Sequence, residues 1–346
     1  MINKKLLIFS FENEEANIIT ASLKKNGEYS PDSFVHSTAQ GFENGIVTDL
    51  SLASDSIQKI CNKINAEEKQ KTHKIVLAVS TSSVSIVDST ATVLISKYAR
   101  EITRHDIDLC LKLGGTIKLP DNKDIFHKMI VDFNVDNDRG ISNPLGLEAV
   151  KLGVRMKLIL VDSTLTKNLE KAVSLGGYDL KKIILNPLAT YLRVFEKGKK
   201  TADILVNMNK CSLEISIFDA NVLVEYKYIE KVASGISGKF SLIHPQALAE
   251  EIMAMKNFKK ATSIHIVGDI FDNDMVATQV EEITGIYTVY GRCFEREQEG
   301  LPEDRLRYIS ALGAIDFINK EIKVSKPSSI ISAMKMKILA FCDEYF

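Results

Sequence analysis

Apolar residues near the start of the chain recur in two patterns, the short runs of β-strands and the period of a helix. KLLIFSF at 5–11, NIITASL at 17–23 and KIVLAVS at 74–80 predict strands, and residues 54–64 predict a helix. Strands that alternate with helices in this way indicate an α/β fold.

A different pattern follows the strand at 74–80. We expect a pair of strands in SIVDSTATVLIS (85–96), a helix in EITRHDIDLCLKLG (101–114) and a strand in IFHKMIVDFNV. Thr103 and Asp106 have the spacing of a capping box, which marks the N-terminus of a helix. The change of pattern indicates a module inserted into the alternating fold.

The alternation then resumes, and a second lobe repeats it. Both halves begin with a predicted hairpin and end in helix–strand units, so we expect two similar lobes. The remaining strands are predicted at 154–163, 202–208, 213–219, 222–231, 263–268 and 287–291, a strand running into a helix at 181–195, and helices at 165–174, 245–255, 275–283 and 306–315.

Charge and cysteine content narrow the class of protein. The 44 basic and 45 acidic residues give a net charge of -1, so no nucleic-acid partner is expected. Five cysteines without a C-x-x-C pair are typical of a reducing compartment, which favours the cytoplasm. No apolar run approaches the roughly 18 residues that span a bilayer, and the N-terminus resembles a first strand more than a signal peptide.

The sequence gives no support to a metal site. The six histidines lack zinc-ligand spacing. Asp132, Asn134, Asp136 and Asp138 imitate the alternating ligands of a calcium loop. However, asparagines stand where that loop needs its glycine and its bidentate glutamate, so these residues are better explained as a turn.

Four segments resemble those of a known family. They are GFENGIVTDLSLA at 41–53, EITRHDIDLCL at 101–111, GISNPLGLEAVKLGV at 140–154 and NPLATYLRVF at 186–195. In order and spacing they are similar to FtsA, the actin-like bacterial cell-division family. The resemblance extends over about the first 195 residues and is loose beyond them.

The resemblance implies an actin-like (ribonuclease H-like) two-lobed α/β fold, with an SHS2-type subdomain inserted in the first lobe. In this family the inserted subdomain serves self-association and contacts with later division proteins. The implied divisions are 1–79 and 161–198 for the first lobe, 80–160 for the inserted subdomain, 199–320 for a second lobe lacking most of subdomain 2B, and 321–346 for a linker and C-terminal amphipathic helix.

The resemblance also locates a nucleotide site, and here the sequence departs from the family. Glycine-rich loops hold ATP and Mg²⁺ in the family, because only glycine lets backbone N–H groups come so close to the phosphates. Neither hairpin keeps a glycine, and the carboxylate of Glu12 would repel a phosphate. The degenerate loop positions are Ser10, Glu12, Asn13, Asn207, Asn209, Lys210, Ser212, Gly268 and Asp269.

We therefore predict a pseudo-ATPase without catalytic residues, which is not an enzyme and does not require the ATP and Mg²⁺ of its family. Lys210 could contact a phosphate as a point charge, although a solvated hairpin lysine is the simpler interpretation. An ATP-binding FtsA-like protein with divergent loops is the alternative.

The second lobe is shorter than in the family. Few residues separate Gly235 from Gly268, where the family has the subdomain whose groove binds the ring-forming tubulin homologue. Direct ring binding would need another surface, and the candidates are EREQEG at 295–300 and the helix QALAEEIMAMKNF.

The C-terminal sequence from Ser328 predicts an amphipathic helix at a membrane surface. Its position resembles that of the FtsA membrane-targeting helix, and lysines near anionic lipid contribute about 1 kcal/mol each. A helix docked on the protein's own core is the alternative. The membrane-facing residues and lysines are Ile331, Met334, Lys335, Lys337, Ile338, Phe341, Cys342, Tyr345 and Phe346.

Together these features predict a cell-division scaffold that resembles FtsA. It would tether components of the division ring (Z-ring) to the cytoplasmic face of the membrane at the midcell septum, and would self-associate. An adaptor for another membrane machine, such as the type IV pilus assembly actin-like protein, is the alternative within the same fold.

Overall fold

The computed structural model separates into two compact units. The first comprises residues 1–82, 164–221 and 225–318, and the second is built on residues 83–163, to which residues 222–224 and the chain from residue 319 are added. The structure describes residues 5–43, 45–67, 74–195, 201–209, 212–230, 245–268, 274–291 and 305–325.

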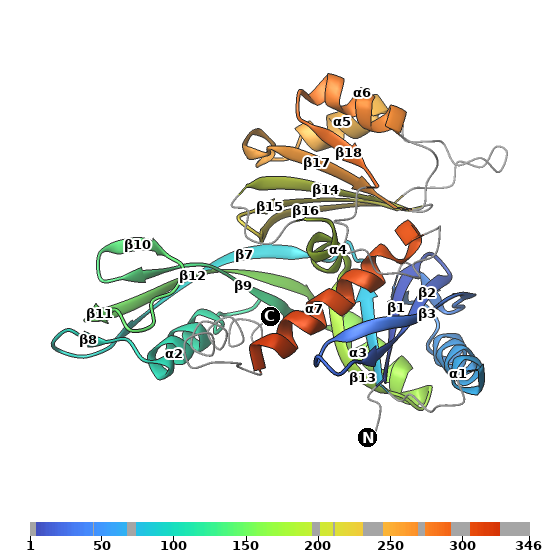
Figure 1. Cartoon of the computed structure of the whole chain (residues 1–346), viewed down its shortest axis with the longest axis horizontal. Helices are drawn as coiled ribbons and strands as arrows, with labels where there is room; N and C mark the ends of the chain where they lie inside the picture. Colours follow the sequence, from blue (N-terminus) through green and yellow to red (C-terminus); the bar gives the residue numbers. More distant parts are fainter. Residues whose placement is uncertain are drawn as a thin grey trace. The chain divides into compact units, whose positions relative to one another are not determined.

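The first sheet of the first unit has the strand order β13-β6-β1-β2-β3 (Figure 1). The strands β1, β2 and β3 form an antiparallel meander, and β6 and β13 add in parallel on the side of β1. The bounds are β1 (Lys5–Glu12), β2 (Glu15–Leu23), β3 (Tyr29–Thr38), β6 (Lys74–Val79) and β13 (Asp179–Leu185). Strand β3 was not predicted, because its polar sequence with Pro31 suits only the edge position that it occupies.

The second sheet repeats this topology with the order β16-β15-β14-β17-β18. Here β14 and β15 pair antiparallel. Strand β17 adds in parallel beside β14, and β18 adds in parallel beside β17. The bounds are β14 (Ala202–Met208), β15 (Ser212–Asp219), β16 (Val222–Glu230), β17 (Ser263–Val267) and β18 (Thr288–Tyr290). The repeated topology confirms the predicted two-lobed, actin-like fold.

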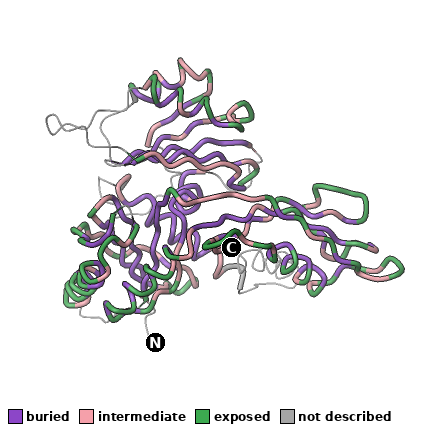
Figure 2. The backbone as a smooth tube through the Cα atoms, turned by 180° about the vertical axis from the view of Figure 1, so that it is seen from behind, coloured by how far each residue is buried: buried purple, intermediate pink, exposed green. Residues whose placement is uncertain are grey.

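Both sheets are buried on their two faces at the centre. Nearly every residue of β1, β2, β14 and β15 is buried (Figure 2). Such strands show continuous apolar runs instead of strict alternation, which is why they were recognisable in the sequence. The helices of this unit are α1 (Leu50–Glu67), α3 (Ser163–Leu175), α4 (Asn186–Val194), α5 (Pro245–Met253), α6 (Asp274–Thr284) and α7 (Ile309–Ser325).

Helix α7 differs from its prediction at the C-terminal end. It continues past Ile315 to Ser325, because Phe317 and Ile318 keep the helical period and no breaker precedes Pro327. Residues 321–325, expected to be linker, are therefore helical.

Helices α4 and α7 are in close contact. The hydroxyls of Thr190 and Ser310 lie 3.0 Å apart, and the buried Arg193 and Asp316 form an ion pair at 3.4 Å. The contact is close because Gly313 has no side chain: a Cβ there would lie 2.0 Å from the carbonyl oxygen of Ala189. These helices flank the second sheet in sequence, so their contact joins the chain segments that enter and leave the second lobe.

The second unit is a four-stranded sheet, of order β10-β9-β12-β7, with helix α2 packed on β7 and β12. The bounds are β7 (Ser85–Leu94), β8 (Arg100–Glu101), α2 (Arg104–Gly114), β9 (Lys123–Val135), β10 (Asp138–Ile141), β11 (Glu148–Ala149) and β12 (Lys151–Asp162). The core lies between α2 and the sheet, where Ile107 and Leu111 join Leu152, Val154 and Met156.

The prediction of two strands in 85–96 is wrong. Residues Ser85–Leu94 form the single strand β7. Its pairing with β12 runs from Ser85 opposite Leu160 to Leu94 opposite Lys151. The segment contains no Gly, Pro or Asn with which to turn, so one long strand is the natural outcome.

The capping box at the start of α2 is confirmed. The Thr103 hydroxyl accepts from the backbone N–H of Asp106 at 3.4 Å, and the Asp106 carboxylate accepts from the backbone N–H of Thr103 at 2.8 Å. Arg100 also donates to both oxygens of Asp106 and so lowers the pKa of that carboxyl. This cap explains why the helix begins at Arg104 and not at residue 101.

None of the helices in the described ranges combines the length and the apolar character that crossing a bilayer requires.

Candidate functional site

The strand pairs of the two predicted phosphate hairpins are both present. In the turn between β1 and β2, Glu12 pairs with Glu15, and Asn13 has a φ of 54°, a left-handed conformation that asparagine tolerates. At the turn between β14 and β15, the backbone N–H of Asn209 donates to the carbonyl oxygen of Ser212 at 2.9 Å. The hairpin geometry therefore persists without glycine.

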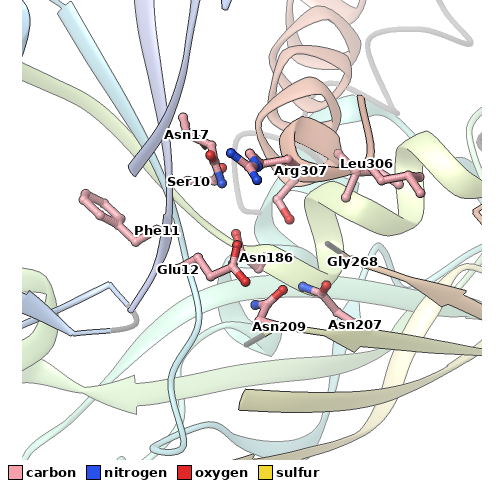
Figure 3. A pocket seen from close by; sticks show the side chains of 12 residues that line it. Ser10, Phe11, Glu12, Asn17, Asn186, Asn207, Asn209, Gly268, Leu306 and Arg307 are labelled. Carbon is pink, nitrogen blue, oxygen red and sulfur yellow. Dashed lines mark hydrogen bonds between the residues drawn. The ribbon is translucent and has the colours of Figure 1, made fainter. Parts of the chain in front are cut away.

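The hairpins contribute to one pocket inside the first unit (Figure 3). The predicted loop positions that line this pocket are Ser10, Glu12, Asn207, Asn209 and Gly268. Asn13 and Ser212 are not among its lining residues. Lys210 and Asp269 lie outside the described residues.

Other lining residues were not predicted from the sequence. They are Asn17 on β2, Asn186 at the start of α4, and Arg307 and Ser310 before and within α7. Asn186 is the first residue of the segment NPLATYLRVF, which is one of the four segments that resemble FtsA. This resemblance is the sequence signal that could have identified Asn186 as a site residue. Asn17 and Arg307 follow no motif, so only the tertiary structure identifies them.

The side chains in the pocket are polar and closely packed. The carboxylate of Glu12 extends towards Asn186, Asn207 and Asn209 (Figure 3). Each of these four residues is buried, and Glu12 is only 7% exposed. The cavity between the lining residues has a volume of about 20 Å³, which is room for about one water molecule.

The residues present do not fit the ATP and Mg²⁺ of the actin-like fold. A nucleotide is far larger than the cavity, and the buried carboxylate of Glu12 would repel its phosphates. Among the described residues, no three His, Cys, Asp or Glu side chains gather as metal ligands.

Gly268 has a structural reason to be glycine. Its φ is 126°, and a Cβ at this position would lie 1.9 Å from the carbonyl oxygen of Met208. The glycine thus permits the chain after β17 to approach the end of β14. Its retention need not reflect nucleotide binding.

The structure describes the calcium-loop-like residues noted in the sequence, but not the C-terminal helix or the segment 295–300. The carboxylate of Asp132 pairs with Arg155, and Asp136 accepts from the backbone N–H groups of Val150 and Lys151, so both are used within the second unit. The predicted membrane-facing residues of the C-terminal helix lie outside the described residues, as does the segment 295–300.

Comparison with known proteins relates the second unit to a family. A model of the family described as "SHS2 domain inserted in FTSA" matches residues 81–160. The cell division protein FtsA of Pseudomonas aeruginosa is 23% identical over 217 residues, which cover 62% of this chain and 52% of the relative. FtsA of Escherichia coli K12 is 23% identical over 210 residues, 59% of this chain and 50% of the relative. The chain spans about half the length of the curated relatives it matches.

A solved structure supports the fold over nearly the whole chain. The PilM–PilN type IV pilus biogenesis complex matches with a TM-score of 0.59 and 10% identity, covering 91% of this chain and 98% of that chain. At this identity the likeness concerns the fold alone. Taken with the duplicated sheets and the match of residues 81–160, these findings show that the chain has the actin-like fold, carries an SHS2 domain and is similar to FtsA over more than half of its length.

Proposed function

We propose that the protein is a cell-division scaffold that resembles FtsA and links division-ring components to the cytoplasmic face of the membrane without hydrolysing ATP. The observation that carries the proposal is the SHS2 domain at 81–160 within an actin-like chain, the combination found in FtsA. By this analogy the second unit supplies self-association and contacts with later division proteins.

The pocket supports the absence of ATP hydrolysis. The cavity of about 20 Å³ beside the buried Glu12 lacks the space that a triphosphate needs. A scaffold can act without ATP hydrolysis. Tethering alone raises the effective concentration of protomers and partners on the membrane surface.

The membrane contact is proposed from the sequence of the last nineteen residues, from Ser328 to Phe346. Apolar residues recur there at helical spacing, and lysines at 323, 326, 335 and 337 suit an anionic surface. Burial of each large apolar side chain would contribute roughly 1.5–3 kcal/mol.

Contact with the ring would use a different surface from that of the family. Between β16 and β17 the described chain contains α5 and a short 3-10 turn, Phe258–Lys260, instead of a further subdomain with a groove. Ring components would therefore be reached through another part of the first unit or through partners of the second unit.

The test is the location of a fluorescent fusion of the full chain in dividing cells, beside a fusion truncated before Ser328. We expect a midcell band for the full chain and diffuse signal for the truncation, and binding to anionic liposomes should be lost in parallel. A charge-reversing double variant, Lys335→Glu with Lys337→Glu, should weaken liposome binding without shortening the chain. Equal liposome binding by full and truncated proteins would contradict the membrane tether.

A second candidate is an adaptor in a pilus-type membrane machine. It is favoured by the fold match to the PilM–PilN complex, whose matched chain is covered to 98% by this protein. A polar or diffuse signal for the full-length fusion would favour this candidate over a division scaffold.

A further inference from the structure

Glu214 is a buried acid at the junction of the two lobes of the first unit. It is the third residue of the hairpin strand β15 and is 1% exposed. Its carboxylate accepts three hydrogen bonds, from Ser80 Oγ at 2.7 Å, from Asn207 Nδ2 at 3.3 Å and from the Tyr226 hydroxyl at 3.0 Å. The group is thus fully enclosed and held by its neighbours.

These donors come from both lobes. Asn207 and Tyr226 belong to β14 and β16, the strands on either side of Glu214 in the second sheet. Ser80 follows β6 of the first sheet, and its hydroxyl accepts from Asn186 Nδ2 at 2.6 Å, at the start of α4. The Tyr226 hydroxyl in addition accepts a backbone hydrogen bond from Thr81. Both residues that follow β6 therefore contact the second lobe through this network.

Among the residues that the structure describes, none of the groups that hydrogen-bond to this carboxylate is a cation. From β6, α4, β14 and β16 the groups that face it are Ser80, Asn186, Asn207 and Tyr226, all uncharged at neutral pH. Burial raises the pKa of Tyr226 well above its ordinary value, and an electrostatic interaction with Tyr228 raises this pKa further. Burial raises the pKa of Glu214 to about 7, against the lowering effect of its three donors.

We propose that Glu214, Ser80, Asn207 and Tyr226 form a proton-responsive latch that holds the two lobes together with protein groups alone. Parting the lobes would separate Ser80 from Glu214 and admit water to the carboxyl group. A buried carboxyl favours its neutral form, whereas the same group in water favours its charged form. The proton on Glu214 therefore favours the closed arrangement.

The direction of the pH effect follows from linkage. The closed form has the raised pKa, about 7, and in the open form the group would return towards the ordinary glutamate value of 4.5. Between these values the closed form binds more protons, so rising pH favours opening. One proton released on opening limits the change in the opening constant to about tenfold per pH unit.

Hydrogen–deuterium exchange of the full chain tests the latch, with rates corrected for the pH dependence of intrinsic exchange. In the wild-type protein, opening in the segments 74–82 and 212–230 should increase together between about pH 5 and pH 7. Glu214→Gln, which is similar in shape but cannot lose a proton, should remove this pH dependence. The same increase in Glu214→Gln as in the wild type would overturn the proposal.

Two further variants test the link between lobes. Ser80→Ala and Tyr226→Phe should raise exchange in both segments at every pH, because each removes a donor to Glu214. Tyr178→Phe is the matched control, since its hydroxyl bonds to Asn62 within the first lobe and its loss should act only there. Circular dichroism establishes that each variant is folded. An effect of Ser80→Ala confined to its own segment would also refute the latch.

Discussion

Single residues in this molecule show how a retained glycine can have a structural cause. Gly268 and Gly313 both lie where another backbone comes within 2.0 Å of the position a Cβ would take. At Gly268 the neighbour is the end of β14, and at Gly313 it is helix α4. Each glycine therefore sets the distance between two elements of the first unit.

Gly313→Ala should destabilise the first unit, although alanine is the better helix former. The added methyl group meets the rigid backbone of Ala189, and such overpacking costs about 1–3 kcal/mol. Urea denaturation of the full chain measures the loss. The control is Gly114→Ala in α2, where the methyl group meets the flexible Met156 side chain at 2.8 Å. A larger loss for Gly114→Ala than for Gly313→Ala would contradict this account.

At the scale of elements, the first turn of α2 is where local sequence alone determines structure. Thr103 and Asp106 satisfy each other's backbone N–H groups, and Arg100 holds the Asp106 carboxylate from the preceding strand. The cap therefore fixes both the start of the helix and its link to β8.

Thr103→Ala should weaken this helix by about 1 kcal/mol, because the hydroxyl that accepts from Asp106 is lost. Amide exchange in residues 104–114 should become about fivefold faster, which corresponds to that energy. Thr103→Ser retains the hydroxyl and should stay close to the wild type. Equal acceleration in both variants would show that the cap bond is not the cause.

The elements that could be predicted from sequence are those with a local signal. Buried strands such as β14, both hairpins and the capped helix α2 were recognisable from apolar runs and cap residues. The edge strand β3 was missed because one exposed side leaves little apolar pattern. Strand β7 differs from the prediction of two strands because Asp88 and Ser89, residue types common in turns, lie in the middle of the segment without forming one.

The candidate site could be predicted only in part, for a similar reason. The loop positions followed from the resemblance, and five of them line the pocket. Asn17, Arg307 and the Glu214 network were missed, because their partners lie far away in sequence: Ser80 and Glu214 are separated by 134 positions. No periodicity or motif encodes such a pair.

For the whole molecule, the two lobes share the duplicated actin-like topology, and the pocket beside the hairpins is lined by polar side chains. The sheets have the same strand order, and Glu12 and four asparagines are among the residues that line the pocket. The fold alone therefore does not determine the chemistry of this pocket, because function resides in a few side chains.

Mg-ATP should not stabilise the full chain against heat. A ligand at 100 times its dissociation constant would stabilise the folded state by about 2.7 kcal/mol, which would raise Tm by several degrees. We expect no shift in Tm with millimolar Mg-ATP relative to Mg²⁺ alone, because the pocket lacks the space for a nucleotide. A clear rise would instead support an ATP-binding FtsA-like protein with divergent loops.

The pairing of β7 with β12 makes the segment 83–163 suitable for exchange between related chains. The main segment of the second unit runs from Ser83 to Ser163, and its ends are adjacent, since Ser85 pairs with Leu160 and Ser83 Oγ accepts from the backbone N–H of Asp162 at 3.3 Å. An inserted segment whose two ends are adjacent can be replaced without changing the path of the rest of the chain. Grafting residues 83–163 between chains would then move the SHS2 domain while leaving the strand order of its host intact.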